Sequence, residues 1–256
     1  MIDEKRPLIF ISNDDGYEAK GILQLIDFLR PLGDLIVMAP DSARSGMSTA
    51  LTADRPITYQ LVKKEPGLVI YKCSGTPTDC VKLSSSALWD RTPDVVIGGI
   101  NHGDNSAVNV HYSGTMGVVK EGCMKGIPSI GFSLCDHAAD ADFTPCKASI
   151  QKIVATVLEK SLPEGVCLNV NYPKATSFKG VRVCRQTKGR WENEWDEYKR
   201  PFGGSYYFLT GEFVSYEQEQ EDTEHWALDH GYVAITPTQI DVTAYDTLED
   251  IRNWDL

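Results

Sequence analysis

The sequence lacks the signals by which zinc proteins and membrane proteins are recognised. No two of the seven cysteines form a C-x-x-C pair, and only five histidines are spread over 256 residues, so no zinc site is indicated. No apolar stretch is long enough to span a membrane, and the opening segment MIDEKRPLIF lacks the apolar core of a signal peptide. We therefore expect no membrane association, a cytoplasmic location, and free thiols at Cys73, Cys80, Cys123, Cys135, Cys146, Cys167 and Cys184.

Positive charge is also scarce. The chain has 25 Lys and Arg residues against 36 Asp and Glu, which gives a net charge of -11. Proteins that bind duplex nucleic acid normally present a basic face, so such a partner is not expected. The acidic composition is still compatible with a small phosphorylated substrate, because a bound divalent cation can supply local positive charge. The run GGINHG at 98–103 does not fit G-x-G-x-x-G and does not follow the first strand, so no dinucleotide site is indicated.

The chain does contain an alternation of short apolar runs and helical patterns. Its hydrophobic content of 42% is ample for a large core. The apolar runs are continuous rather than alternating, which is typical of parallel strands covered on both faces. We predict an α/β fold with a Rossmann-like, doubly wound, mainly parallel sheet. The predicted strands are 7–12, 34–39, 67–73, 94–99 and 128–134, and the predicted helices are 22–29, 77–89, 115–125 and 146–160.

The pattern changes after about residue 180, where the chain becomes aromatic, charged and rich in turns. We interpret this part as strands or a hairpin outside the main sheet. The acidic run from Glu217 to Glu224 is interpreted as a solvated loop, and the aromatic residues beside it indicate an arm that packs on another subunit. We predict one domain over 1–256, with a core at 1–180 and a hairpin and C-terminal arm for oligomerisation at 181–256.

Polar, mostly glycine-rich loops follow the predicted strands. In a doubly wound sheet the ligand site lies beyond the carboxyl ends of the strands, so these loops should converge on one edge. The loops are Asn13-Asp14-Asp15-Gly16, APDSARSGMS at 39–48, SGTPTDC at 74–80, GGINHGDN at 98–105, and YSGT at 112–115 before a helix.

Asp14 and Asp15 are candidate metal ligands and catalytic carboxylates. Two adjacent carboxylates repel each other unless one is protonated or a cation lies between them. Ser45 and Asn101 offer a hydroxyl and an amide oxygen from neighbouring loops, and such an all-oxygen set suits Mg²⁺ or Mn²⁺. The structural alternative is an Asx turn or a helix N-cap at the two aspartates, and backbone hydrogen bonds at Ser45 and Asn101.

The remaining loops suit anion binding. Gly75 lets the backbone approach a ligand, and the YSGT segment opens a helix whose N–H groups can hold a phosphate. A capping box formed by Thr76, Pro77 and Asp79 would by itself explain the loop at 74–80. At Ser113, a simple helix N-cap is the structural alternative to phosphate binding. His102, His111 and Arg44 need no catalytic role. The candidate phosphate and substrate contacts are Asn13, Gly75, Thr76, Ser113, Gly114 and Thr115.

These motifs, in this order and spacing, resemble the SurE family of survival-protein nucleotidases. The motifs that carry the resemblance are NDDG, APDSARSG, SGTPTDCVKL, GGINHGDN and YSGT. The resemblance is close from residue 7 to about 135. It continues more loosely through RQ at 185–186, PFGGSYY at 201–207 and HGYVAITP at 230–237.

The resemblance implies a metal-dependent phosphatase that acts on nucleoside 5′- and 3′-monophosphates, and on short polyphosphate in some members. It implies one Mg²⁺ or Mn²⁺ per subunit, held by Asp14, Asp15, Ser45 and Asn101. It also implies a homodimer or homotetramer assembled through an arm at 185–225 and the tail after Pro237.

The expected reaction is in-line attack on the phosphate by a water that the metal activates. In a competing mechanism, Asp14 or Asp15 is a nucleophile and forms an aspartyl-phosphate. Two other functions remain open at this stage. One is a nucleotide-sensing stress module without turnover, and the other is a metal-dependent nucleotide-sugar transferase.

Overall fold

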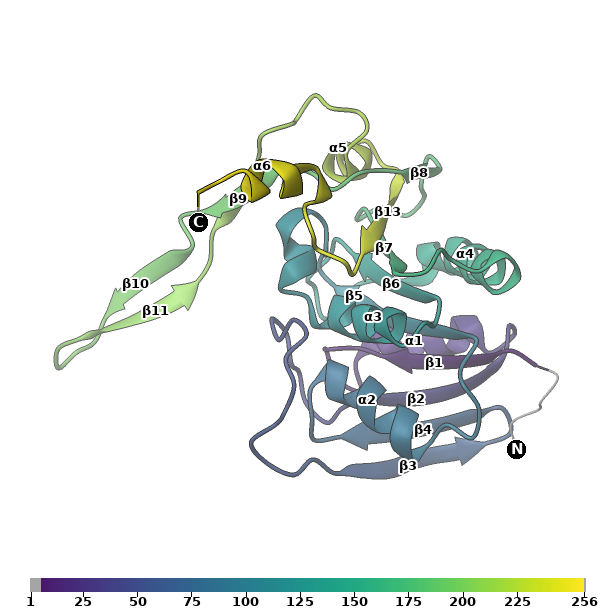
Figure 1. The fold of residues 1–256 in the computed structure, drawn as a ribbon. Coiled ribbons are helices and arrows are strands. Elements are labelled where there is room, and N and C mark those ends of the chain that lie inside the picture. The colour runs from purple at the N-terminus through teal and green to yellow at the C-terminus, as the bar shows by residue number, and fades with distance from the viewer. Residues whose placement is uncertain (1–5, 256) are drawn as a thin grey trace.

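A nine-stranded sheet forms the centre of the protein, which a computed structural model describes over residues 6–255 (Figure 1). Its strands are β1 (Leu8–Ser12), β2 (Asp34–Pro40), β3 (Tyr59–Glu65), β4 (Leu68–Cys73), β5 (Val95–His102), β6 (Ser129–Leu134), β7 (Val166–Tyr172), β8 (Val181–Val183) and β13 (Val233–Gln239). Their spatial order is β3-β4-β2-β1-β5-β6-β7-β13-β8.

The sheet is parallel from β4 to β7, and this confirms the predicted doubly wound fold. From β1 the chain moves outward to β2 and β4, and then returns to place β5 on the other side of β1. The carboxyl ends of β1 and β5 therefore lie side by side where the winding direction reverses. In such folds this switch point is the usual ligand site.

Helices cover both faces of the sheet. On one face, Ile9 and Ile11 of β1 share a core with α1 and α4, whereas Leu8 and Phe10 face the other core, which includes Val81 of α2. This alternation explains why β1 is buried throughout and reads as a continuous apolar run. The helices are α1 (Lys20–Leu29), α2 (Pro77–Ala87), α3 (Gly114–Met124), α4 (Lys147–Lys160), α5 (Glu224–Asp229) and α6 (Leu248–Arg252), with 3-10 turns η1 (Ala107–His111), η2 (Thr144–Cys146) and η3 (Tyr245–Thr247).

Four strands of the main sheet depart from the sequence-based prediction. β7 was not predicted, although most of its residues are buried. β3 was not predicted, and it joins the sheet edge antiparallel to β4 with most of its side chains exposed. β13 and β8 lie after residue 180, yet they belong to the main sheet, with β13 antiparallel to β7. The prediction that everything after residue 180 lies outside the sheet is therefore wrong for these two strands.

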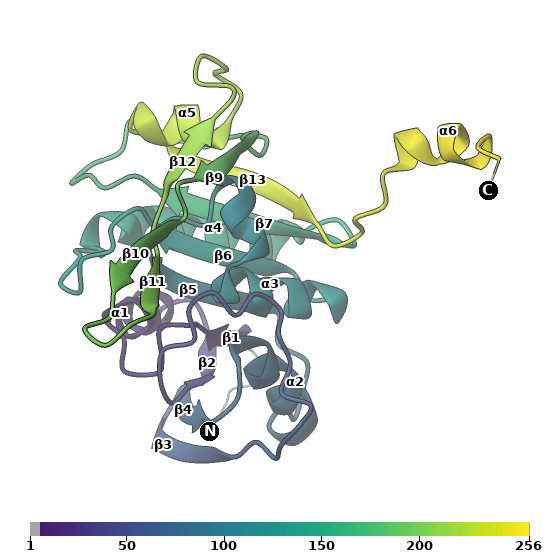
Figure 2. The same cartoon turned by 90° about the vertical axis from the view of Figure 1, so that its left-hand side faces the viewer.

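The rest of the C-terminal part forms an arm, as predicted. Strands β9 (Gly189–Glu192) and β12 (Glu212–Ser215) pair at its root, and β10 (Trp195–Lys199) and β11 (Ser205–Leu209) form a hairpin that projects from the body (Figure 1). After β13 the tail with α6 runs away from the core (Figure 2). Large apolar side chains are exposed on both segments, namely Trp195, Tyr198, Phe202, Tyr206, Tyr207, Phe208, Leu209, Val242, Tyr245, Ile251 and Trp254.

The seven cysteines are free thiols, and all but the half-buried Cys135 are buried. This confirms the expectation of unpaired cysteines. Among the described helices, none has both the length and the apolar character needed to cross a membrane.

Candidate active site

The turn after β1 is held by Asn13 and Gly16. The buried Asn13 donates from Nδ2 to the Gly16 carbonyl oxygen (2.9 Å) and accepts at Oδ1 from the Gly16 N–H (3.2 Å). Gly16 has a φ of 103°, a conformation that glycine adopts without a steric penalty. Both polar groups of the Asn13 amide thus shape the turn, and a substrate contact by Asn13 stays a prediction.

The carboxylate of Asp14 lies against the first turn of α3. Thr115 donates from Oγ1 to Asp14 Oδ1 over 2.6 Å. A Cβ at Gly114 would lie only 2.7 Å from Asp14 Cβ and 2.9 Å from Asp14 Oδ2, so a glycine is needed here. The NDDG and YSGT motifs, about one hundred residues apart, therefore meet at the switch point, where the helix N-terminus favours negative charge.

Asp14 and Asp15 are electrostatically coupled. Burial raises the pKa of Asp14 to about 6, the Thr115 hydrogen bond opposes this rise, and the charge of Asp15 adds to it. Burial also raises the pKa of Asp15, although the hydrogen bond from His102 and the charges of His102 and His137 act in the opposite direction. Because each ionised carboxylate makes ionisation of the other harder, a cation between them would relieve the repulsion.

The loop after β2 is tied to this turn through its backbone. The Arg44 N–H donates to the Asp14 carbonyl oxygen over 2.6 Å, and the exposed Ser45 is the next residue along the chain. Metal binding by Ser45 stays a prediction. The Arg44 guanidinium is 3.5 Å from Asp41 Oδ1 and 3.5 Å from the Ser74 carbonyl oxygen. Arg44 therefore pairs with a carboxylate, which explains its position without a catalytic role.

Asn101 approaches the site from β5, where the pairing register with β6 shifts between Gly98 and Asn101. Asn101 Nδ2 donates to the Gly103 carbonyl oxygen over 2.8 Å, and this orients the amide while leaving Oδ1 as its acceptor. The adjacent His102 N–H lies 3.4 Å from Asp15 Oδ2. The end of β5 thus lies beside Asp15, just as Asp14, at the end of β1, lies beside the start of α3.

The donor chemistry of this site fits a divalent cation. Within residues 6–255, no third His, Cys, Asp or Glu side chain joins the two carboxylates in a metal-binding group. The other proposed ligands are the hydroxyl of Ser45 and the amide oxygen of Asn101. Such hard oxygen donors suit Mg²⁺ or Mn²⁺, and two mutually repelling carboxylates favour binding of a cation.

The loop at 74–79 has contacts that account for it without a ligand. Thr76 Oγ1 accepts from the Asp79 N–H (3.1 Å) and donates to the Ala50 carbonyl oxygen (2.7 Å), and this confirms the predicted capping box. A Cβ at Gly75 would lie 2.7 Å from Asp79 Cβ, so Gly75 makes room for that carboxylate. Phosphate contacts by Gly75 and Thr76 stay predictions.

At the other predicted phosphate loop, Ser113 is the N-cap of α3. Its Oγ accepts from the Met116 N–H over 3.0 Å. The helix start that it caps also contains Gly114 and Thr115, which contact Asp14. The YSGT segment is therefore the predicted anion loop that the structure brings closest to the candidate metal ligands.

Two groups of buried polar residues near the site were missed from the sequence. Asn105 donates from its N–H to Asn171 Oδ1 (2.8 Å) and from Nδ2 to Ser133 Oγ (2.8 Å), while Asn169 donates to the Asn105 carbonyl oxygen (2.7 Å). The only sequence signal was the position of Asn105 within GGINHGDN.

The second missed group includes Glu224, which is 1% exposed. The interpretation of Glu217 to Glu224 as a solvated loop is wrong for this last residue. Glu224 begins α5 and lies beside β13, so its position in an acidic run did not indicate its burial.

Comparison with known proteins identifies the family. The family model described as "Survival protein SurE" matches residues 9–193. The chain belongs to the SurE family. A curated relative from Phocaeicola vulgatus, named 5′-nucleotidase SurE, is 61% identical over 99% of this chain and 98% of its own length. A relative of the same name from Bacteroides fragilis is 58% identical over all of both chains.

A solved SurE structure supports the fold. The crystal structure of the SurE protein from Aquifex aeolicus matches with a TM-score of 0.83 and 35% sequence identity, covering 96% of this chain and 98% of that one. The SurE resemblance of the sequence motifs is thus confirmed over nearly the whole chain, including the β-strands after residue 180.

Proposed function

We propose that this chain is a divalent-metal-dependent 5′-nucleotidase that hydrolyses nucleoside monophosphates to nucleoside and inorganic phosphate. The observation that carries the proposal is the meeting of Asp14 with Gly114 and Thr115 at the switch point of the sheet. The names of the SurE relatives at 58% and 61% identity favour this reaction over a transferase or a sensor. On the resemblance of the motifs alone, we extend the proposal to 3′-monophosphates and short polyphosphate.

The proposed cofactor is one Mg²⁺ or Mn²⁺ per subunit. Asp14, Asp15, Ser45 and Asn101 would hold it through oxygen atoms. When bound, such an ion neutralises phosphate charge and lowers the pKa of water. The chain's own residues would bind and orient the substrate around that site.

Asp14 and Asp15 are the proposed catalytic carboxylates. Because burial raises the pKa of both, protons would compete with the cation for these carboxylates as pH falls. Thr115 donates to one carboxylate oxygen of Asp14, and the backbone N–H of Gly114 also stabilises the ionised carboxylate by a hydrogen bond. The N-terminus of α3, capped by Ser113, would hold the remaining phosphate oxygens through its N–H groups. This division of roles favours the metal site over an aspartyl-phosphate intermediate.

We also propose assembly into a homodimer or homotetramer. The supporting observation is the exposure of aromatic and aliphatic side chains on the β10–β11 hairpin and on the tail. Large exposed apolar surfaces of this kind mark protein interaction sites. We further propose a cytoplasmic location. The free thiols support it, because unpaired cysteines are typical of a reducing compartment.

The function can be tested by measuring phosphate release from AMP with Mn²⁺ and with EDTA. We expect release only with the metal, and we expect Asp15→Asn to abolish it without loss of the fold. Nucleotide binding without release would support the sensing function instead. Transfer of a sugar from a nucleotide sugar, without release from AMP, would support the transferase.

A further inference from the structure

The segment Gly103–Ser113, here called the β5–α3 loop, joins two parts of the candidate site. Asn101 precedes it, and the phosphate-binding start of α3 follows it. Near its middle, Ala107 has a φ of 50°, in the left-handed region that residues other than glycine rarely adopt. A backbone in this conformation persists only where surrounding contacts hold it.

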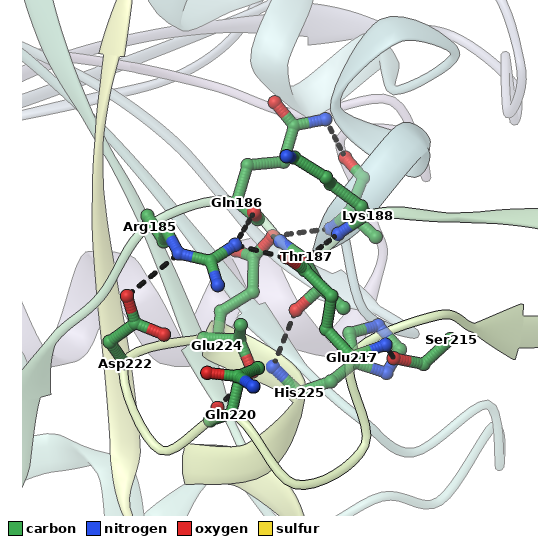
Figure 3. Close-up of polar contacts among 12 residues, drawn as sticks. Arg185, Gln186, Thr187, Lys188, Ser215, Glu217, Gln220, Asp222, Glu224 and His225 are labelled. Atoms are coloured by element: carbon green, nitrogen blue, oxygen red, sulfur yellow. Dashed lines mark hydrogen bonds and ion pairs between the residues drawn. The ribbon is translucent and has the colours of Figure 1, made fainter.

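Two residues from the C-terminal part hold both polar groups of Ala107. Glu224 Oε1 accepts from the Ala107 N–H over 2.5 Å. Gln186 Nε2 donates to the Ala107 carbonyl oxygen over 2.9 Å. Figure 3 shows Gln186 and Glu224 on neighbouring segments. The unusual conformation of the β5–α3 loop is therefore fixed from outside the loop.

Glu224 is an unusual residue for this task, because a carboxylate is costly to bury. Its Oε1 also accepts from the Thr187 N–H (3.3 Å), and its Oε2 accepts from Thr236 Oγ1 (2.8 Å). Among the ion pairs of residues 6–255, none involves Glu224. One buried acid thus joins the β5–α3 loop, the segment after β8, and β13.

Further contacts to the same loop come from the same part of the chain. His225 Nε2 lies 2.9 Å from Ser106 Oγ, and Trp191 donates from Nε1 to Asn109 Oδ1 over 2.8 Å. A cavity of about 580 Å³ adjoins Ala107, Gln186 and Glu224. Hydrogen bonds from the C-terminal part therefore hold the loop at Ser106, Ala107 and Asn109.

We propose that Glu224 is a positioning residue for phosphate-ester hydrolysis, which fixes the β5–α3 loop and thereby the phosphate-binding start of α3. The proposal rests on the nucleotidase function proposed above. It gives the segment after residue 184 a role within each subunit's own site, besides any role in assembly. Glu224 acts through Ala107 and does not touch the substrate.

The test compares Glu224→Ala, Glu224→Gln and Gln186→Ala with Glu219→Gln, a control at an exposed carboxylate in the same segment. Steady-state rates with AMP and Mn²⁺ would be measured well below each variant's melting temperature, and the folded fraction would be checked by circular dichroism. Inhibition by inorganic phosphate would be measured in parallel as a probe of the anion site.

For Glu224→Ala we expect kcat per folded molecule to fall about 10- to 100-fold, comparable to the loss when a residue that orients a metal ligand is replaced. Phosphate should also inhibit this variant more weakly. Glu224→Gln keeps an acceptor for the Ala107 N–H and should recover most of the activity. Gln186→Ala changes an exposed side chain, so it should fold even if Glu224→Ala does not, and its kcat should fall several-fold.

Two results would overturn the role of Glu224. One is a folded Glu224→Ala with wild-type kcat and phosphate inhibition, whatever its melting temperature, because this is the result of a purely structural role. The other is a loss in Glu224→Gln equal to that in Glu224→Ala, because then the acceptor does not matter. If Glu224→Ala does not fold, a fully active Gln186→Ala would overturn it. A wild-type protein without phosphate release would remove the nucleotidase function itself, and this proposal with it.

Discussion

Replacing Asp14 with asparagine should stabilise the metal-free protein at neutral pH, although it should remove the activity. Asp14 is 3% exposed, and its pKa is raised by burial from 3.8 to about 6. The folded state therefore binds the Asp14 proton more tightly than the unfolded state does. As pH rises from the unfolded pKa through the folded one, the wild type loses stability, because the buried carboxylate must ionise.

The size of this effect follows from the shift. A difference of about two pKa units corresponds to about 3 kcal/mol above pH 6. Asparagine has no such ionisation, and its Oδ1 can still accept from Thr115. The new amide N–H₂ needs a partner, so about 3 kcal/mol is an upper limit for the gain. A gain of 2 to 3 kcal/mol would raise the melting temperature by roughly 5–10 °C for a chain of this size.

The assay is thermal unfolding of the metal-free protein, measured in EDTA at pH 7.5 and at pH 4. A third melting curve is measured at pH 7.5 with Mn²⁺ in place of EDTA. We expect Asp14→Asn to melt above the wild type at pH 7.5 and close to it at pH 4. Mn²⁺ should stabilise the wild type and have little effect on the variant. Asp27→Asn, at an exposed position on α1, is the matched control and should change neither curve.

A metal-free Asp14→Asn that is no more stable than the wild type at pH 7.5 would refute this reasoning. A gain of equal size at pH 4 would refute it as well. Either result would mean that burial of the ionised carboxylate is not what limits stability at this site.

Three more predictions follow from the same contacts. Gly114→Ala should abolish phosphate release from AMP, because a Cβ there would lie 2.7 Å from Asp14 Cβ; a folded variant with wild-type kcat would contradict this. The affinity for Mn²⁺, measured by calorimetry, should fall as pH drops below about 6, because protons compete for Asp14 and Asp15; a pH-independent affinity between pH 5 and pH 7.5 would contradict it. Removal of residues 241–256 should lower the oligomeric state seen by light scattering, because it removes the exposed Val242, Tyr245 and Trp254; an unchanged mass would separate the tail from assembly.

Most strands of the core could be predicted from the sequence because they are wholly or largely buried and therefore apolar, although β7, with most of its residues buried, was not predicted. β1, β2, β4, β5 and β6 are continuous apolar runs, and their predicted limits agree with the structure to within one residue, apart from the longer end of β5. The capping box of Thr76 and Asp79 was also readable, because it depends only on residues three positions apart.

Other elements depend on contacts between distant parts of the chain. β3 is an exposed edge strand of sequence YQLVKKE, and it carries no apolar run. β13 finds its place through pairing with β7, which no local pattern in HGYVAITP indicates. The burial of Glu224 follows from hydrogen bonds to Ala107 and Thr236, far apart in sequence, so its acidic neighbours gave a misleading signal.

For the candidate site, the sequence could indicate which loops share one edge of the sheet, because that follows from the order of strand and loop. It could not indicate which residues of those loops touch. The structure brings Asp14 to Thr115 and the loop at Arg44 to Asp14, while the polar groups of Thr76 and Asn13 are engaged in their own turns. The roles of Ser45 and Asn101 as metal ligands stay predictions.

The central claim is that Asp14, Asp15, Ser45 and Asn101 hold one divalent cation beside the start of α3. The most direct test is anomalous diffraction from a crystal soaked with Mn²⁺ and phosphate. We predict one manganese peak bonded to oxygen atoms of these four residues, with the phosphate at the N-terminus of α3. A peak that contacts neither Asp14 nor Asp15, or a phosphate bound away from α3, would contradict the account.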